Sequence, residues 1–382
     1  MLKAGGPQPS PMEGLTPEDR ARYARHLTLP QVGESGQARL KASSVFCVGA
    51  GGLGSPALLY LAAAGVGSIT IIDDDMVERS NLQRQILHAD RDIGVSKAKS
   101  ALLRLKELNP SISIQVHSHR LTSENALSLV EGHDIVLDGT DNIPTRYLVN
   151  DACEILGIPW VYGSIYRFEG QVSVFNLEQG PTYRDLFPTP PPPESVPSCE
   201  DGGVLGVLPG VVGSIQATEV VKVLLGIGDS LRGRLLVYDA LDMTMRTLAF
   251  TAIEREPVTE LIDYEGFCGA KPVEMPFAEI SPTHYRQRCA EGWTPLFIDT
   301  RNDIEASIVS LPDTHSLVPH EDILMSGLPK DRDLVFYCRT GGRSAMAAYA
   351  LAQTGYDADR LYNLQGGIHA WHSEIDASVP KY

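Results

Sequence analysis

Long apolar runs are scarce in this chain of 382 residues. The most apolar stretch, residues 56–72, is interrupted by glycines and followed by three aspartates, so it indicates a helix, a turn and a strand rather than a membrane span. Basic tracts are lacking too, since 32 Lys and Arg residues stand against 48 Asp and Glu residues. With a net charge of −16 we expect neither nucleic-acid nor membrane binding.

Cysteine is also sparse, with six residues at irregular spacing. That pattern argues against a disulfide framework and favours reduced thiols in a cytoplasmic protein. Residues 1–15 are rich in Gly and Pro and have no apolar core, so we expect a disordered tail and no secretory signal. The length excludes one small module, and 43% hydrophobic residues supply more than one core.

Apolar strands alternate with amphipathic stretches from residue 44 onward. This alternation predicts a parallel sheet with crossover helices, an α/β fold of the Rossmann type. The first strands are expected at 45–48, 68–72, 112–116 and 134–137, after an early helix from Thr16 through Arg25. Later strands are expected at 160–163, 170–175, 235–238 and 247–250, with a helix at 213–225. We expect this first domain over residues 16–265, a linker at 266–276 and a smaller α/β domain at 277–382.

A glycine-rich loop follows the first expected strand and precedes a helix. Its glycines are Gly49, Gly51, Gly52 and Gly54, and such a loop lets backbone amides and a helix dipole approach phosphate. Asp73 ends the next strand, where an acid can bind a ribose hydroxyl. These features predict a nucleotide site, but they fit NAD and ATP alike.

The residues that follow favour ATP. The string Ser80-Asn81-Leu82-Gln83-Arg84-Gln85 supplies a cation, and Lys97 supplies another. A triphosphate needs such charges and a nicotinamide ring does not. Asp141 follows the fourth strand, where a carboxylate can hold Mg²⁺. The alternative is a nicotinamide-dependent oxidoreductase with a regulatory sulfur-binding module, and a third hypothesis is a non-catalytic scaffold that binds a carrier protein.

Residues 22–261 resemble the ubiquitin-activating-like adenylyltransferases of the MoeB/ThiF family. The resemblance includes Arg22-Tyr23-Ala24-Arg25, the glycine loop, the string at 81–85 and Thr140-Asp141-Asn142. It implies a homodimer that uses ATP and Mg²⁺ to adenylate the C-terminal Gly-Gly of a ubiquitin-like sulfur-carrier protein. Molybdopterin, thiamin and cysteine pathways use such carriers, and the sequence does not select one.

The resemblance also implies roles for individual residues. Arg84 and Asp141 would be catalytic, Asp141 would be the metal ligand, and Arg25 would reach into the partner subunit's site. The implied nucleotide-binding residues are Gly49, Gly51, Gly52, Gly54, Asp73, Ser80, Asn81, Leu82, Gln83, Arg84, Lys97, Asp141, Asn142 and Arg25.

Two cysteine positions bear on this resemblance. Many relatives carry two CxxC pairs for zinc, but residues 182–185 read Thr-Tyr-Arg-Asp and only Cys268 remains near the second pair, so we expect no structural zinc.

Cys199 stands where relatives have a mobile loop cysteine, which implies a thioester or disulfide link to the carrier. An ordinary thiol is the alternative, because the adjacent Glu200 disfavours a thiolate.

A second chemical site is predicted around Cys338. The residues Arg339, Thr340, Gly341, Gly342, Arg343 and Ser344 follow it, between an apolar strand and an alanine-rich helix. Such a loop turns backbone N–H groups inward and, with a helix N-terminus and two arginines, stabilises a thiolate or a persulfide.

The loop resembles the active loop of rhodanese-type sulfurtransferases, supported by residues 298–301 and 366–371. Related cysteine phosphatases place five residues between cysteine and arginine, and the four here favour sulfur over phosphate. A persulfide donor or thiosulfate is implied. The two sites together predict that sulfur from Cys338 reaches the activated carrier and gives a C-terminal thiocarboxylate.

Overall fold

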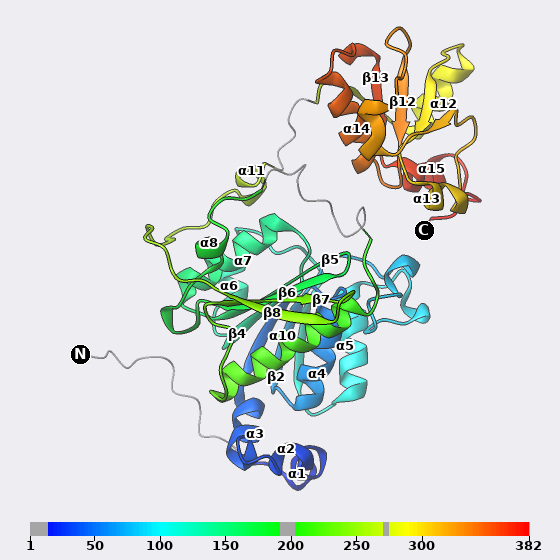
Figure 1. The fold of residues 1–382 in the computed structure, drawn as a ribbon. Coiled ribbons are helices and arrows are strands. Elements are labelled where there is room, and N and C mark those ends of the chain that lie inside the picture. The colour runs from blue at the N-terminus through cyan, green and yellow to red at the C-terminus, as the bar shows by residue number, and fades with distance from the viewer. Residues whose placement is uncertain (1–13, 192–202, 270–274, 382) are drawn as a thin grey trace. The chain divides into compact units, whose positions relative to one another are not determined.

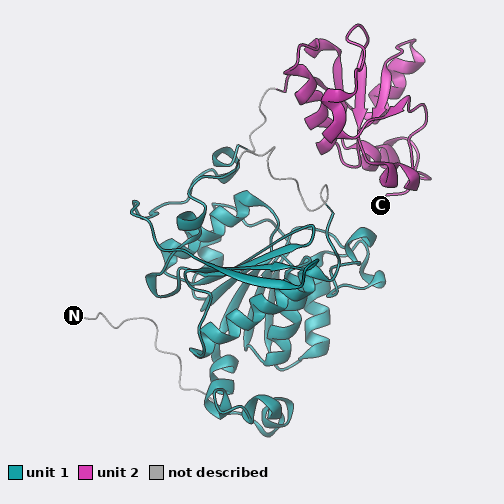
Figure 2. Ribbon diagram, in the orientation of Figure 1, with its two compact units in different colours: residues 1–270 teal, residues 271–382 magenta. Residues whose placement is uncertain are grey.

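The computed structural model describes residues 14–191, 203–269 and 275–381 (Figure 1). The chain divides into two compact units, residues 1–270 and 271–382 (Figure 2). Each unit is built on a β-sheet of its own. Most of the expected N-terminal tail lies outside the described residues, as do Cys199 and residues 192–197 of the proline-dense stretch.

The first unit contains an eight-stranded sheet in the order β3-β2-β1-β4-β5-β6-β7-β8. The neighbouring strands β3, β2, β1, β4 and β5 pair in parallel. The strands β5, β6, β7 and β8 pair antiparallel. The bounds are β1 Ser44–Val48, β2 Ser68–Ile72, β3 Ser113–His117, β4 Ile135–Asp138, β5 Trp160–Tyr166, β6 Glu169–Phe175, β7 Arg234–Asp239 and β8 Thr244–Ala249. The strand order reverses between β1 and β4, and ligands of such sheets bind at the carboxyl ends of the strands there.

Helices cover both faces of this sheet. The described helices of this unit are α1 Pro17–Arg22, α2 Ala24–Leu27, α3 Gly33–Ala42, α4 Gly54–Ala64, α5 Lys97–Leu108, α6 Ala126–Val130, α7 Ile143–Leu156, α8 Tyr183–Leu186, α10 Leu208–Leu225 and α11 Tyr264–Phe267. Single 3₁₀ turns occur at Arg79–Asn81, Asp90–Asp92 and Leu177–Gln179.

The side chains of β1 alternate between two separate cores. Val45 and Cys47 pack with residues of α4, α5 and α10 on one face. Phe46 and Val48 pack with residues of α6 and α7 on the other. Successive side chains of a strand point to opposite faces, so a strand buried on both faces has a continuous apolar sequence.

The second unit holds a five-stranded parallel sheet in the order β11-β10-β12-β13-β9. Its strands are β9 Ala278–Ile280, β10 Leu296–Asp299, β11 Ser316–Leu317, β12 Leu334–Tyr337 and β13 Leu361–Leu364. Its helices are α12 Pro282–Ala290, α13 Asp303–Ile308, α14 Gly342–Ala352 and α15 Gly367–Glu374, with a 3₁₀ segment at His320–Met325 and a 3₁₀ turn at Ala358–Arg360. Tyr285 and Trp371 pack on one face, and Ala347 and Leu351 on the other. Strand β12 is the middle strand of this sheet, and Cys338 is the residue that directly follows it.

Most of the expected strands agree with the structure to within two or three residues at each end. The helix expected at 213–225 begins earlier, at Leu208, because Pro209 suits the first turn of a helix. The helix expected from Thr16 through Arg25 is divided, since α1 ends at Arg22 and α2 begins at Ala24. Thr16 caps α1 as expected, with its hydroxyl oxygen accepting from the Asp19 N–H at 3.1 Å.

Helix α10 is long and apolar enough to span a membrane by length and composition. Half of this helix is buried within the unit, where it packs against α4 and β5. Its apolar character therefore has an explanation in the core of the domain.

Candidate active sites

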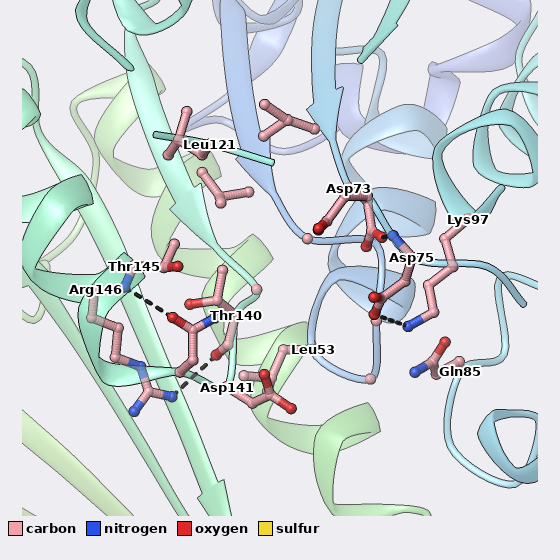
Figure 3. A pocket seen from close by; sticks show the side chains of 18 of the residues that line it. Leu53, Asp73, Asp75, Gln85, Lys97, Leu121, Thr140, Asp141, Thr145 and Arg146 are labelled. Carbon is pink, nitrogen blue, oxygen red and sulfur yellow. Dashed lines mark hydrogen bonds and ion pairs between the residues drawn. The ribbon is translucent and has the colours of Figure 1, made fainter. Parts of the chain in front are cut away.

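A cavity of about 400 Å³ opens in the first unit at the carboxyl ends of β1, β2 and β4 (Figure 3). This is the position that the strand order favours for a ligand. Eight of the expected nucleotide-binding residues line it: Gly49, Gly51, Gly52, Asp73, Arg84, Lys97, Asp141 and Asn142.

The glycine-rich loop forms one wall of the cavity. Gly49 follows β1 and Gly54 begins α4, so the loop connects a strand to a helix N-terminus. A Cβ atom on Gly54 would lie 2.1 Å from the carbonyl oxygen of Gly49, which only a glycine avoids. Gly54 does not line the cavity and instead packs behind the loop.

Asp73 holds this loop at the end of β2. Its Oδ2 accepts from the Ala50 N–H at 2.7 Å, and its Oδ1 accepts from the Asp75 N–H at 2.9 Å. Burial raises the pKa of Asp73, and the Ala50 N–H and the charge of Lys97 act in the opposite direction. In the described structure the Asp73 carboxylate therefore fixes the loop as well as facing the cavity.

Two cations reach the cavity from different segments. Lys97 is the first residue of α5, is 7% exposed at its side chain and pairs with Asp75 at 2.7 Å (Figure 3). Arg84 follows a 3₁₀ turn, and its Nη1 donates to the Ser80 carbonyl at 3.1 Å. Positive groups so placed can neutralise a polyphosphate.

The other expected residues of the string do not line the cavity. The Asn81 carbonyl accepts from the N–H groups of Arg84 and Gln85 at 3.0 and 2.9 Å. The Asn81 side chain accepts from the Glu78 N–H at 3.1 Å. Asn81 thus builds the turn that presents Arg84 and Gln85, while Ser80, Leu82 and Gln83 lie outside the lining.

Asp141 and Asn142 lie between β4 and α7. Asp141 is exposed and faces the cavity (Figure 3). Asn142 is the N-cap of α7, because its side-chain oxygen accepts from the Thr145 N–H at 2.9 Å. The helix cap fixes the residue beside Asp141, and the Asp141 carboxylate stays accessible.

Arg146 is a site residue that the sequence did not reveal. It is 8% exposed, and its Nη2 donates to the carbonyls of Thr140 and Gly163 at 3.1 and 3.3 Å. Its Nε lies 3.6 Å from Oδ2 of the buried Asp138, and burial raises the pKa of Asp138 while Arg146 opposes that rise. Arg146 thereby joins the loop after β4 to β5. No pattern in the sequence pointed to Arg146, because α7 also carries other polar residues such as Asn150 and Asp151.

The other lining residues come from strand ends and from the segments that follow them. They are Val48, Leu53, Ile72, Asp74, Asp75, Gln85, His119, Arg120, Leu121, Gly139, Thr140, Thr145, Ser164, Ile165 and Tyr166. Val48, Ile72 and Leu121 give the cavity an apolar part. Leu53, Gln85 and Thr140 lie within motifs of the sequence, whereas the residues after β3 and in β5 could not be singled out, because only the sheet order brings these strands close to β1.

Arg25 does not line this cavity and is exposed on α2. A separate groove of about 500 Å³ lies between α2, α3, α4 and α10 of the same unit. His26 and Leu29, which neighbour Arg25 in the chain, line the groove together with Tyr60. Arg25 therefore stands beside an apolar groove and outside the cavity of its own chain.

In the second unit, Cys338 lies in a loop between β12 and α14. Its side chain is fully buried, and its Sγ accepts from the Gly341 N–H at 3.1 Å and from the Ser344 hydroxyl at 3.4 Å. Gly341 has a φ of +98°, a left-handed backbone conformation that favours glycine at this turn of the loop. The Cys338 carbonyl accepts from the Ile368 N–H at 3.0 Å, so the start of α15 supports the loop.

The two arginines of this loop differ in their surroundings. Arg343 is 4% exposed and forms two bonds of 2.6 Å to the Glu305 carboxylate of α13. The Arg339 Nε contacts the His369 Nε2 at 3.4 Å. Arg343 thus links the loop to α13, and Arg339 links it to α15.

The region where relatives carry zinc holds an ion-pair network. Arg184 pairs with the buried Asp151 through two bonds of 2.7 Å, and the Tyr264 hydroxyl donates to Asp151 at 2.7 Å. The guanidinium of Arg184 also stacks on Phe267, next to Cys268. The guanidinium of Arg184 is positively charged, whereas the thiolates that ligate zinc are negatively charged. The expectation of no structural zinc stays a prediction.

Comparisons with known proteins agree with both sites. The ThiF family model matches residues 23–257, and the rhodanese-like domain model matches residues 281–374. The chain is 47% identical over 390 residues to the probable adenylyltransferase/sulfurtransferase MoeZ of Mycobacterium tuberculosis, with 98% of each protein covered. It is 42% identical over 399 residues to the adenylyltransferase and sulfurtransferase MOCS3 of Drosophila persimilis, covering 98% of this chain and 88% of that protein.

A solved structure shares the fold of the first unit. The crystal structure of E. coli MccB with MccA-N7isoASN superposes with a TM-score of 0.57 at 19% identity, over 63% of this chain and 74% of that one. These comparisons do not support the nicotinamide-dependent oxidoreductase that the glycine loop alone left open.

Proposed function

Because this chain belongs to the ThiF family and carries a rhodanese-like domain, we propose that it adenylates and then thiolates a ubiquitin-like sulfur-carrier protein. The observation that carries the proposal is the presence in one chain of a cavity with a glycine loop and two cations and of a buried, hydrogen-bonded Cys338. We place the reaction in the cytoplasm, where thiols stay reduced.

In the first step the C-terminal carboxylate of the carrier attacks the α-phosphorus of ATP and pyrophosphate leaves. A carboxylate is already ionised at neutral pH, so the step needs alignment and charge neutralisation rather than a general base. We assign the neutralisation to Arg84 and Lys97. Lys97 must exchange its bond with Asp75 for a phosphate oxygen.

Magnesium fits the donors of the cavity. The Asp141 carboxylate is exposed there, and oxygen ligands of this type suit a hard divalent cation. Among the described residues, Asp73, Asp74 and Asp75 form a further carboxylate group whose ligand atoms lie within 4.8 Å of one another. When bound, the ion would balance phosphate charge, and we assign Asp141 as its protein ligand.

In the second step the terminal sulfur of a Cys338 persulfide attacks the acyl carbon of the adenylate and AMP leaves. The product is an acyl disulfide between the carrier and Cys338. A thiolate then attacks the Cys338 sulfur, which releases the thiocarboxylate and leaves a disulfide that an external dithiol must reduce. Cys199, outside the described residues, is our candidate for this thiolate, and the alternative is that it first traps the acyl group as a thioester.

We also propose a homodimer in which Arg25 enters the partner subunit's cavity. The exposure of Arg25 and the apolar groove beside it support this arrangement. Light scattering on the purified protein tests the dimer. Mixing Arg25→Ala chains with Lys97→Ala chains should restore part of the adenylation, because a mixed dimer contains one cavity with both residues intact.

The main experiment separates the two half-reactions. Cys338→Ala should abolish sulfur transfer from thiosulfate, because no persulfide can form, and should leave carrier-dependent ATP–pyrophosphate exchange intact. Cys289→Ala, in the same unit and half-buried, is the matched control and should affect neither.

Mass spectrometry of Gly-Gly-terminated carrier proteins supplies the positive readout. Incubation with the enzyme, ATP, Mg²⁺ and thiosulfate should replace one oxygen of the carrier with sulfur. The proposal is wrong if Cys338→Ala loses both half-reactions while remaining folded, or if no carrier yields AMP.

A further inference from the structure

The carbonyl and amide of Ala50 are both held in place within the glycine-rich loop. Its N–H donates to Asp73 at 2.7 Å, and its carbonyl oxygen lies 2.9 Å from Nε2 of His88. Ala50 is fully buried, and its bond to His88 is buried as well, whereas its bond to Asp73 is partly buried. The path of the backbone past Gly49 and Gly51 therefore depends on two side chains from other segments.

The hydrogen bonds define the protonation of His88. A carbonyl only accepts, so Nε2 must carry the proton, and Nδ1 then accepts from the Ser100 hydroxyl at 2.8 Å. His88 is 7% exposed, and burial followed by the charge of Lys97 lowers its pKa. The neutral ring thus has one donor and one acceptor, and both are used.

His88 joins three segments that supply groups to the cavity. Its side-chain Nε2 donates to the glycine loop. Its backbone N–H donates to the Gln85 carbonyl at 3.1 Å, in the turn that presents Arg84. Its Nδ1 binds Ser100 of α5, the helix that begins at Lys97. The imidazole of His88 therefore connects the glycine loop to the helix of Lys97, and the His88 backbone connects both to the turn of Arg84.

We propose that His88 is a positioning residue for the nucleotide, which holds the glycine loop in register with Arg84 and Lys97 without contacting ATP. His88 does not line the cavity, which distinguishes this role from direct binding. The inference rests on the proposed adenylation and adds to it the residue that shapes the phosphate site.

Two substitutions of similar size separate the two ring bonds. In His88→Gln the amide nitrogen reaches the position of Nε2 and can still donate to Ala50. In His88→Asn the shorter amide reaches only the position of Nδ1, so the Ala50 carbonyl loses its donor. We expect His88→Asn to raise both the dissociation constant and the KM for ATP about tenfold, which is the loss of one buried hydrogen bond. His88→Gln should stay within about threefold of the unchanged protein, and kcat should change less than KM in both variants.

His133 provides the matched control. It is a half-buried histidine of the same unit, with Nε2 bonded to Thr70 at 2.9 Å and its ring against Phe46 on the other face of the sheet. His133→Asn should leave ATP affinity unchanged. Circular dichroism reports folding of the whole chain, and thiosulfate sulfur transfer by Cys338 reports folding of the second unit by itself.

Calorimetric titration with ATP and Mg²⁺, without carrier, gives the decisive result. Equal affinities in His88→Asn and His88→Gln would overturn the positioning role, as would equal losses in His133→Asn. If the unchanged protein binds no ATP at all, the proposed function fails before this inference is reached.

Discussion

At the scale of single residues, buried charged side chains such as Arg301 and Arg343 are paired with side chains of opposite charge. Arg301 and Asp299 are both at most 1% exposed, and their side chains form bonds of 2.9 and 2.5 Å. Arg301 also donates to the carbonyls of Glu305 and Val309. One guanidinium thus ties the end of β10 to the middle and the C-terminal end of α13, the helix whose Glu305 binds Arg343 of the Cys338 loop.

Arg301→Met should lower the free energy of unfolding of the second unit by about 3–5 kcal/mol, because it leaves Asp299 charged and buried without its partner. Urea unfolding followed by tryptophan fluorescence measures it, since two of the three tryptophans, Trp293 and Trp371, lie in the second unit and Trp160 lies in the first. Arg286→Met breaks an exposed pair with Asp313 and should stay within about 1 kcal/mol. Similar losses in the two variants would contradict the expectation.

The thiol of Cys268 should react slowly in the folded protein. Burial, and secondly Glu265, raise its pKa to about 11, so at pH 8 the reactive thiolate is rare. Alkylation by iodoacetamide should increase about tenfold for each pH unit between 8 and 10. The pKa of this thiol is thus higher in the folded chain than its ordinary value of 9.0. This difference stabilises the folded state below about pH 9, and the stabilisation is lost as the pH rises toward 11.

Peptide mapping after alkylation measures the rate at each cysteine. The half-buried Cys289 serves as the internal comparison in the same sample. Modification of Cys268 that is already fast and independent of pH at pH 8 would show that its surroundings do not disfavour the thiolate.

At the scale of elements, α10 supports the glycine loop through close contact with α4. A Cβ atom on Gly213 would lie 2.4 Å from the Leu53 carbonyl oxygen and 2.6 Å from Cγ of Pro56. Pro209 of the same helix lies 3.3 Å from the corresponding position on Gly52. The packing of α10 therefore reaches the residues that form the phosphate side of the cavity.

Gly213→Ala should destabilise the first unit by about 1–3 kcal/mol, because the helices must separate to admit a methyl group. Gly210→Ala is the control in the same helix, since a Cβ atom there has no neighbour within 4 Å. It should stabilise the unit by up to about 1 kcal/mol through higher helix propensity. Urea unfolding followed by circular dichroism compares them, and equal effects would show that the helix contact is not restrictive.

These glycines also show why part of the fold could not be predicted. Strands such as β2 were evident because both faces are buried and the sequence is continuously apolar. The start of α10 was missed because Pro209 and Gly210 are typical of helix boundaries, although both lie in the first turn of α10. The close contact of Gly213 with Leu53 and Pro56 was not evident from the sequence either. Local sequence carries no information on such contacts.

The same distinction applies to the cavity. Arg84 and Lys97 belong to motifs and were predicted to be near phosphate, and they do line the cavity. Arg146, Arg120 and His88 belong to no motif, and their positions follow from strand order and packing. Their roles become visible only when hydrogen-bond partners are known.

At the scale of the whole molecule, each unit is organised around its own hydrophobic clusters. Covalent connection then matters chiefly by raising the concentration of the persulfide near the adenylate. Joining two modules in one chain can give an effective concentration in the millimolar range.

Cleavage at a protease site inserted between Gly269 and Met275 should leave pyrophosphate exchange and thiosulfate sulfur transfer unchanged. Thiocarboxylate formation with micromolar halves should fall about 100-fold, because sulfur transfer becomes bimolecular. Mass spectrometry of the carrier measures the rate, and the uncut insertion variant is the control. An unchanged rate after cleavage, with the halves separate on size-exclusion chromatography, would show that the connection is dispensable.

The complete burial of the Cys338 side chain has a chemical consequence for the empty enzyme. Peroxide from solution has little access to this sulfur in the described conformation, so oxidation of the unloaded cysteine should be slow, and thiosulfate must displace part of the loop in order to load it. Loading adds a second sulfur about 2 Å from Sγ. That outer sulfur, rather than Sγ, is then the atom that attacks the activated carrier.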